Sequence, residues 1–239
     1  MLAPMPLLEG RELVKRYGDK AVLNSVSVAI DSGESVAIAG PNGAGKTTLL
    51  SILAGVHKPD DGEVVADNSR LGWVPQRAAV YGKLTVRENL KLFGKLERVD
   101  DVDGSVTRIL ERIELTHRAD DRAENLSGGM RQRLSIGMGL ISDPTVLLLD
   151  EPSAALDPLQ RERLWELLGS LVSHGIALVF STHAAGEVEG HASRVLILDG
   201  GDLLFDGRPN DIGPGAHFEL AFINFLRERR ATVAGSDAR

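Results

Sequence analysis

The sequence has no cysteine and no long apolar run. Without cysteine, the chain holds neither a disulfide framework nor a thiol nucleophile. No apolar stretch approaches the roughly 18 residues of a membrane-spanning helix, and one of the longest, Gly175 to Phe180, suits a buried strand. Residues 1–6 lack the basic start and apolar middle of a signal peptide. We therefore expect a cytosolic protein.

Positive charge is also in short supply, because 27 lysines and arginines stand against 34 aspartates and glutamates. This balance argues against broad nonspecific nucleic-acid binding, so we expect no nucleic-acid partner. Internal repeats, low-complexity tracts and heptad stretches are absent as well. The 239 residues allow one large α/β domain or two small ones, with a substantial core in either case.

The most informative stretch is Gly40-Pro41-Asn42-Gly43-Ala44-Gly45-Lys46-Thr47-Thr48. It fits the phosphate-binding pattern Gly-x-x-x-x-Gly-Lys-[Ser/Thr]. A buried strand is expected before it, at 35–39, and a helix after it, at 48–54. Turn N–H groups, the helix dipole and the Lys46 ammonium then converge on one anion, while the Thr47 hydroxyl is placed for magnesium. We predict a site for a nucleoside triphosphate.

Two segments before this loop, 7–14 and 22–30, have the mixed alternation of strands in an exposed or edge sheet. Tyr17 is expected in the turn between them. Its ring either stacks on a nucleotide base or is an ordinary surface tyrosine, and the residues alone favour neither. A strand at 71–74 ends before Gln76, which either coordinates a metal or orients a water, or is a plain loop residue.

The character of the chain changes after Gln76. Thr85 and Glu88 form a capping box that opens a helix, and apolar residues recur at helical spacing through 106–113. We predict a helical subdomain over about residues 77–144, inserted into a core of residues 1–76 and 145–215. Within it, the stretch Ser127-Gly128-Gly129 either forms a second anion site at a helix N-terminus or only caps that helix. Considered by itself, the stretch is better explained as a cap.

The apolar run at 145–149 predicts a central parallel strand with Asp150 and Glu151 at its C-terminal edge, where open α/β sheets bind ligands. Two buried carboxylates need a cation nearby. Magnesium beside Asp150 meets this need and leaves Glu151 to orient or deprotonate an attacking water. His183 follows the strand at 176–180 and emerges from the same type of edge, although a lone histidine is more often structural.

The remaining segments complete the predicted domain. Asp157 is explained as the N-cap of the next helix, so a functional role needs separate support. A strand at 195–198 and a hairpin partner at 203–205 end the core. A last helix over 216–230 has an apolar face, and packing onto its own domain is favoured over docking of a partner. Residues 231–239 are expected to form a flexible tail.

Together these motifs resemble the ATP-binding cassette of ABC transporters in order and spacing, along nearly the full chain. The resemblance identifies Walker A at 40–48, the Q-loop at Gln76, the signature at 126–130, Walker B at 146–150 followed by Glu151, the D-loop at Asp157 and the switch histidine at His183. It implies one α/β domain over residues 1–230. That domain has a P-loop NTPase core with a mostly parallel sheet, an N-terminal antiparallel β subdomain and an inserted α-helical subdomain.

The resemblance also implies how the site works. Two cassettes pair head to tail around two ATP molecules and Mg²⁺, each site completed by the opposite subunit. The implied catalytic residues are Glu151 as base, His183, Gln76 and Lys46, and the implied magnesium ligands are Thr47, Gln76 and Asp150. The implied nucleotide contacts outside Walker A are Tyr17 on adenine, with Ser127, Gly128, Gly129 and Asp157 reaching the opposite subunit's site. Separate transmembrane permease subunits are the further partner, which places the chain at the cytoplasmic face of a membrane.

Departures from the family's commonest pattern remove no catalytic group. Met130 stands where the signature usually has Gln, and the D-loop reads Ser153-Ala154-Ala155. Gly137 and Gly139 interrupt the helix that follows the signature, at a cost of about 1 kcal/mol each relative to Ala. We therefore predict that both sites of a homodimer hydrolyse ATP.

Residues 81–92 and 203–207 are similar to cassettes of bacterial ABC-2 type exporters, a group that includes drug-efflux systems. The favoured function is thus an ATPase that powers export of a drug, lipid or other small molecule. Alternatives are an importer cassette, an idle partner, or a nontransport ATPase of DNA repair, chromosome organisation or translation. Intact Glu151 and His183 argue against an idle partner. Only 104 positions separate Lys46 from Asp150 (150 minus 46), too few for a repair protein's coiled coils.

Overall fold

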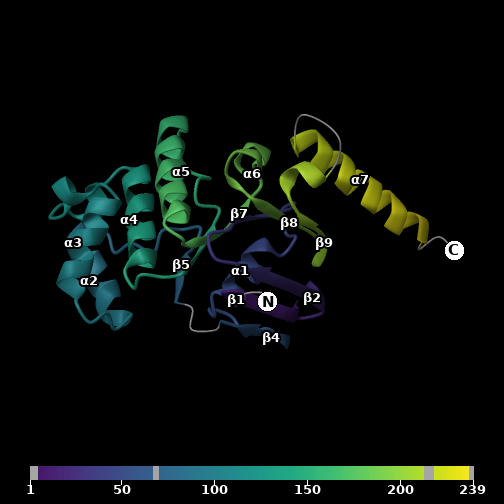
Figure 1. Ribbon diagram of the computed structural model, residues 1–239, viewed down its shortest axis with the longest axis horizontal. Helices are drawn as coiled ribbons and strands as arrows, with labels where there is room; N and C mark the ends of the chain where they lie inside the picture. The colour runs from purple at the N-terminus through teal and green to yellow at the C-terminus, as the bar shows by residue number, and fades with distance from the viewer. Residues whose placement is uncertain (1–4, 67–69, 213–217, 237–239) are drawn as a thin grey trace.

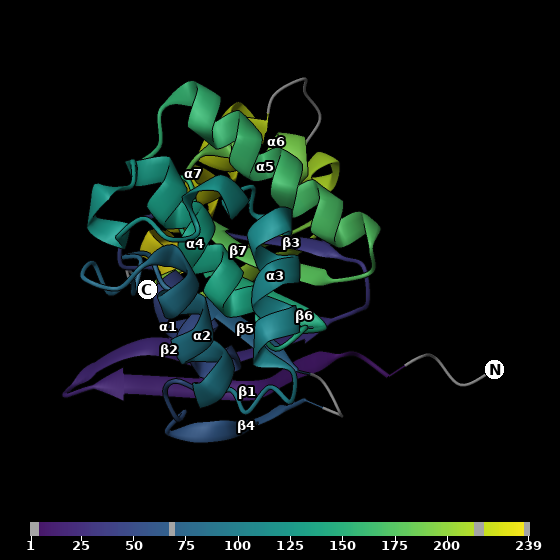
Figure 2. The ribbon, with the colours of Figure 1, turned by 90° about the vertical axis from the view of Figure 1, so that its left-hand side faces the viewer.

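The computed structural model describes residues 5–66, 70–212 and 218–236. A small antiparallel sheet, a mostly parallel sheet and a group of helices lie against one another (Figure 1). The antiparallel sheet has the order β2-β1-β4, with bounds β1 Leu8–Tyr17, β2 Lys20–Ile30 and β4 Asp61–Val65. Tyr17 is the last residue of β1, paired with Lys20, so its predicted place in the turn was wrong. Figure 2 shows this sheet as a separate layer below the rest.

The larger sheet carries the site. Its order is β5-β6-β7-β3-β8-β9, with bounds β3 Ser35–Ala39, β5 Leu71–Val74, β6 Val146–Asp150, β7 Ala177–Thr182, β8 Arg194–Asp199 and β9 Asp202–Gly207. All neighbours run parallel except the β8–β9 hairpin. Every residue of β3, β6 and β7 is buried, as expected for parallel strands covered on both faces. The predicted central strand ending at Asp150 is confirmed.

Alternate residues of β6 enter two different apolar cores, because side chains of a strand point to opposite faces. Val146 and Leu148 pack with α1 (Lys46–Leu53) and the antiparallel sheet. Leu147 and Leu149 pack on the other face with α4 (Gly128–Leu140), α5 (Pro158–Ser173) and α6 (Ala185–His191). The parallel sheet is therefore held rigidly between two layers.

The helices at one end of the molecule are α2 (Val86–Leu96), α3 (Val102–Arg112) and α4, joined through the 3-10 turns η1 (Thr116–Arg118) and η2 (Ala123–Asn125). The predicted capping box is present: the Thr85 N–H donates to Glu88 at 2.8 Å, and the Glu88 N–H donates to the Thr85 hydroxyl at 3.1 Å. Their carboxylate and hydroxyl close the N-terminus of α2 from within the chain.

The glycines that weaken α4 have a packing role. A Cβ at Gly137 would lie 2.8 Å from Ile113 on the α3 side, and one at Gly139 would lie 2.9 Å from Val74 of β5. Such distances are below van der Waals contact, so the absent side chains let α4 approach both neighbours. The loss of helix propensity thus accompanies close contact between the helices and the sheet.

Helix α7 (Phe218–Ser236) follows the 3-10 turn η3 (Pro209–Asp211) and projects from the β8–β9 side (Figure 1). It runs to Ser236, past the predicted end at 230, so residues 231–236 are helical where a flexible tail was expected; 237–239 lie outside the described residues. Phe225 contacts Phe205 of β9 with ring centroids 6.0 Å apart, and Phe218 is buried, which confirms packing onto its own domain. Among the described residues, no helix combines the length and apolarity that crossing a membrane requires.

Candidate functional site

The phosphate-type loop connects the end of β3 to the start of α1. Gly43 and Gly45 have φ values of 81° and 105°, in the left-handed region that favours glycine. A Cβ at Gly45 would lie 2.6 Å from the Val22 carbonyl oxygen. Gly45 is also the N-cap of α1 and supplies no side-chain hydrogen bond, so the first N–H groups of the helix face the loop uncapped. This is an anion-binding arrangement.

Lys46 lies inside this loop, with 6% of its surface exposed. Its ammonium donates hydrogen bonds to the carbonyl oxygens of Gly40 at 2.8 Å and Pro41 at 3.1 Å. Burial lowers the pKa of Lys46, and the charges of Glu151 and Asp150 oppose that shift. The loop thus holds a desolvated cation beside its free N–H groups.

Asp150 ends β6 and is almost fully buried, at 3% exposed. Its Oδ1 accepts hydrogen bonds from the Thr47 hydroxyl at 3.1 Å and the Ser181 hydroxyl at 2.6 Å. Thr47 and Asp150 were predicted to meet at a magnesium ion, and their oxygens do lie together. Ser181 was not predicted; it lies opposite Asp150 in the register of β6 and β7, which only the sheet order reveals.

Glu151 follows Asp150 with a φ of 43°, an unusual backbone conformation for a residue other than glycine. Its N–H donates to the Ser181 hydroxyl at 2.9 Å, which fixes the turn. Its carboxylate accepts from the Gln76 amide at 3.0 Å and lies 3.3 Å from His183 Nδ1. The three predicted residues therefore converge, although Gln76 contacts Glu151 and not the Thr47–Asp150 pair.

A cleft of about 420 Å³ opens over this loop. The residues that line it are Tyr17, Lys20, Val22, Asn42, Gly43, Ala44, Gly45, Lys46, Thr47, Thr48, Gln76 and Glu151. The Tyr17 ring is 52% exposed, and the Lys15 ammonium lies 5.7 Å from its centroid. An exposed aromatic face at the rim of a phosphate cleft is suited to stacking on a base. Lys20 and Val22 were not predicted, because only the pairing of β1 with β2 brings them to the cleft.

The donor set at the cleft fits magnesium. Mg²⁺ prefers oxygen ligands and is commonly held by one or two carboxylates together with substrate phosphates. Asp150 and Thr47 offer a buried carboxylate and a hydroxyl at one point. Within the described ranges, no three His, Asp or Glu side chains gather closely enough to hold a metal alone.

Ser127 caps α4: its hydroxyl accepts from the Met130 N–H at 3.3 Å. A Cβ at Gly129 would lie 2.8 Å from the Gln160 side chain, whereas the Gly128 position faces open space. Ser127 does not line the phosphate cleft of its own chain. Asp157 likewise caps its helix, accepting from the Gln160 N–H at 2.9 Å, and is absent from the cleft lining. One chain therefore brings together only part of the predicted site.

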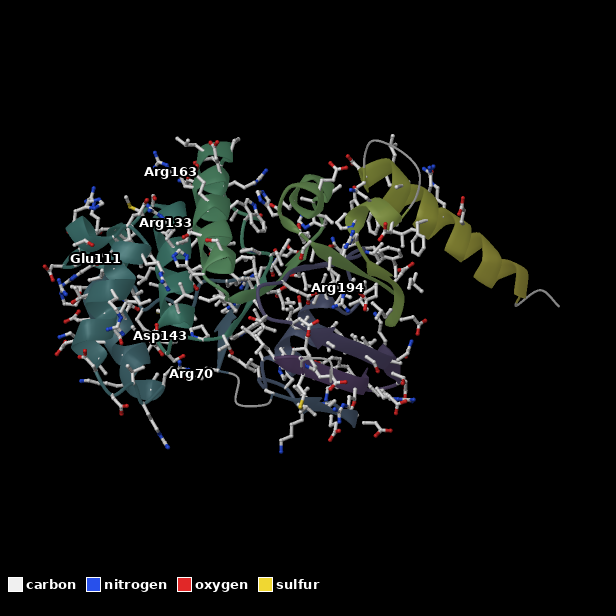
Figure 3. The ribbon with its side chains drawn as sticks, in the orientation of Figure 1. Arg70, Glu111, Arg133, Asp143, Arg163 and Arg194 are labelled. Carbon is white, nitrogen blue, oxygen red and sulfur yellow. The ribbon has the colours of Figure 1, made fainter. Side chains whose placement is uncertain are left out.

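A second hollow, of about 990 Å³, lies between α3, α4 and α5 and is lined by charges of both signs (Figure 3). Arg133 pairs with Glu114 at 2.9 Å, and Arg108 lies 3.6 Å from Asp143. None of the predicted site residues lines it. Its balanced charges indicate packing between the helices and give no preference for a ligand of one sign.

Residues 23–154 match the family model described as ABC transporter, and the chain belongs to this family. It is an ATP-binding cassette, the subunit type that binds and hydrolyses ATP.

Two relatives indicate which ABC transporter proteins the chain resembles. The chain is 36% identical over 220 residues to Nod factor export ATP-binding protein I of Rhizobium meliloti (strain 1021), covering 87% of this chain and 66% of that protein. It is 32% identical over 219 residues to linearmycin resistance ATP-binding protein LnrL of Bacillus subtilis (strain 168), covering 86% and 70%. The chain thus spans about two thirds of the length of these relatives.

Solved structures share the fold. One, described as the ATP-binding subunit of an ABC transporter, is 26% identical with a TM-score of 0.82, covering 92% of this chain and 99% of that one. A dimeric cassette in a post-hydrolysis state, bound to ADP and Pi, is 27% identical with a TM-score of 0.75, covering 84% and 98%. A cassette of the Clostridium perfringens cbiONQ transporter complex is 29% identical with a TM-score of 0.77, covering 87% and 91%. The predicted fold class is therefore confirmed.

Proposed function

We propose that two copies of this cassette, or this chain and a similar one, close around two ATP molecules and power export of a small molecule through separate permease subunits. The observation that carries the proposal is the convergence of groups from three strand ends: Lys46 and Thr47 after β3, Asp150 and Glu151 at the end of β6, and His183 after β7. Lys46, Thr47 and Glu151 line the cleft, and Asp150 and His183 contact these lining residues from beside it. Groups suited to binding, metal and proton-transfer roles in phosphoryl transfer to water thus lie at one place.

Each group has a distinct part in hydrolysis. The Lys46 ammonium and the N–H groups of residues 43–48 bind the β- and γ-phosphates. Thr47 and Asp150 would hold Mg²⁺, which neutralises the charge that develops on the phosphates when it is bound. Tyr17 stacks on the adenine. The chemistry of these residues supports the phosphate and magnesium assignments, and the resemblance to ABC cassettes supports the adenine contact of Tyr17.

Glu151 accepts the proton of the attacking water. Its carboxylate lies beside the Gln76 amide, at 3.0 Å, and the His183 ring, at 3.3 Å, and both partners orient it towards the cleft. His183 is exposed and can also donate to the γ-phosphate oxygen. Gln76 stands at the rim, where its contact with Glu151 can report on movement of a membrane subunit.

The second half of the site comes from a partner cassette. Ser127 and Gly128 lie outside the phosphate cleft of their own chain, yet they present a hydroxyl and free helix N–H groups. We assign them, with Gly129 and Asp157, to the nucleotide of the opposite subunit. A dimeric cassette bound to ADP and Pi among the structural neighbours supports this assignment.

Export is favoured by the relatives, whose names record Nod factor export and linearmycin resistance. A permease is favoured because a structural neighbour is part of a transporter complex. The chain would then lie at the cytoplasmic face of the membrane. An importer cassette is the second candidate, and a nontransport ATPase of DNA repair or translation is the third.

The test is to purify the tagged chain from membranes in mild detergent and to identify the proteins that accompany it. We expect a polytopic membrane protein in stoichiometric amount, with ATPase activity in the complex. Recovery with ribosomes or DNA and without a polytopic protein would overturn the proposal. Reconstitution into vesicles, with the direction of substrate movement measured, separates export from import.

A further inference from the structure

The segments that carry Glu151 and His183 are joined by a buried carboxylate behind the cleft. Glu187, on α6, is 7% exposed and reaches both segments. One carboxylate oxygen accepts a hydrogen bond from the Ser153 hydroxyl, and the other accepts from the Thr182 hydroxyl at 2.6 Å. Ser153 lies two residues after Glu151, and Thr182 directly precedes His183. A single side chain thus bridges the two strand exits.

The bridge has further supports. The Thr182 hydroxyl also accepts from the Ala184 N–H at 3.0 Å, which holds the backbone on both sides of His183. Arg161 of α5 lies 3.9 Å from Glu187, so the buried carboxylate has a cation beside it. Ser153 and Thr182 are themselves 4% and 3% exposed. Water therefore cannot easily replace these bonds.

We propose that Glu187 is a positioning residue for ATP hydrolysis, which fixes the spacing between the Glu151 carboxylate and the His183 ring. This inference rests on hydrolysis at the proposed site. Nearer the sheet, Ser181 already links Asp150 to the Glu151 N–H. Further along, Glu151 and His183 contact each other at 3.3 Å, and Glu187 links the neighbouring residues Ser153 and Thr182 behind that contact. Ser153 also begins the loop that leads to Asp157, so the same carboxylate connects the partner-facing loop to the histidine.

The experiment compares Glu187→Ala with Glu189→Ala in the full-length chain. Glu189 is a matched control, because it lies on the same helix but accepts from the Phe218 N–H of α7. We expect Glu187→Ala to lower kcat about 100-fold, the loss typical of a small misplacement of reacting groups, with the ATP dissociation constant unchanged. Glu187→Gln, which keeps one acceptor oxygen, should recover part of the loss. Glu189→Ala should retain the wild-type kcat.

A double variant separates positioning from general weakening of the fold. If Glu187 acts through His183, adding Glu187→Ala to His183→Ala lowers kcat no further. Independent, multiplying losses would overturn the proposal. So would a fall in ATP affinity and thermal stability that accounts for the whole loss of rate.

A readout without hydrolysis keeps the two proposals distinguishable. The ring resonances of His183, assigned by their loss in His183→Ala, should move in Glu187→Ala and stay in place in Glu189→Ala. Unmoved resonances would contradict the positioning role. A wild-type chain that hydrolyses no ATP, alone or with its permease, would count against the proposed function, while the resonances would still test Glu187.

Discussion

Two helix N-termini in this chain contain glycines, which precede the helix at α1 and are its first two residues at α4, and they differ in how much of a phosphate site each one builds. At α1, the turn uses left-handed glycines, the N-cap Gly45 offers no side chain, and Lys46, Asp150 and Glu151 gather around the free N–H groups. At α4, Ser127 caps the helix in an ordinary extended conformation, and Gly128 lines a separate hollow of about 360 Å³ beside Gln76 and Glu151, outside the phosphate cleft. The first gathers most groups of a phosphate site within one chain, and the second is the surface that we assign to a nucleotide held by another molecule.

The N-terminus of a third helix, α2, is the opposite case, because groups of its own chain cap it. At α2, the Glu88 carboxylate accepts from the Thr85 N–H and so supplies the anion from within the chain. The Val86 and Arg87 N–H groups donate to the carbonyl oxygens of Asp121 and Ala119, so the first turn of α2 keeps no free donor for a ligand. The three helices thus range from internally capped to open for a phosphate, and substitutions can test each position in that range.

The largest expected effect is at the complete site. Glu151→Gln removes the proton acceptor but keeps the shape of the side chain, so kcat should fall about 100- to 10,000-fold while ATP still binds. Equilibrium dialysis and steady-state hydrolysis measure the two quantities, and size-exclusion chromatography with ATP should reveal a trapped dimer. Glu162→Gln on the exposed side of α5 is the control. Wild-type turnover in Glu151→Gln would remove Glu151 from the role of base.

At the incomplete site, Ser127→Arg should abolish ATP-dependent dimerisation while each chain still binds nucleotide. The arginine fills the surface that we assign to the partner's γ-phosphate. Because the change also removes an N-cap worth about 1 kcal/mol, Ser127→Ala is the matched control for lost capping. Sedimentation of the Glu151→Gln background with ATP measures dimer formation. Dimers that persist in Ser127→Arg would defeat the assignment to the opposite subunit.

A pair of glycine substitutions compares the starts of α1 and α4 directly. Gly45→Ala should destabilise the fold by about 1–3 kcal/mol and weaken ATP binding, because its φ is 105° and its Cβ would meet the Val22 carbonyl. Gly128→Ala meets open space at a helical position and should be stabilising by about 0.4–1 kcal/mol. Urea unfolding of both variants provides the values. If both substitutions lowered the free energy of unfolding by the same amount, the backbone would be equally constrained at Gly45 and Gly128.

The smallest effect is at α2. Hydrogen bonds from Thr85 hold the pKa of Glu88 below its ordinary value of 4.5. Since the folded pKa is the lower one, the charged carboxylate contributes stability above pH 4.5 and loses it as the pH falls through the folded pKa. Glu88→Gln should therefore unfold at a slightly lower urea concentration than wild type at pH 7. This difference in the unfolding midpoint should disappear in acid. A difference that is constant with pH would rule out a charge effect.

Local pattern predicted much of the fold. The bounds of β3 and β5 follow from short apolar runs beside turn residues, and the caps at Thr85, Ser127 and Asp157 follow from capping chemistry. Helix α6 was missed, since its seven residues include Gly186 and Gly190 and repeat no apolar pattern. Helix α7 extends to Ser236, past the end predicted at residue 230.

The site was predictable only where its residues carry their own chemistry. Lys46 can be recognised because it belongs to a P-loop pattern. Asp150 and Glu151 can be recognised because acidic residues at the end of a buried strand are unusual unless they bind a ligand. Ser181 and Glu187 do not stand out, since serine and glutamate are common and their partners come from distant segments. The role that we propose for Ser127 involves a second molecule, so neither the sequence pattern nor one folded chain tests it.

The position of β3 in the sheet has a consequence for synthesis of the chain. β3 pairs with β7 and β8 only, and β7 begins at Ala177, 138 residues after the end of β3 (177 minus 39). At roughly 5–20 residues per second, a ribosome needs about 7–28 s to cover this distance. Throughout that interval the strand that leads to Lys46 has no neighbour in its sheet. Nascent chains that stop before β7 should therefore be unable to retain ATP, however complete their P-loop.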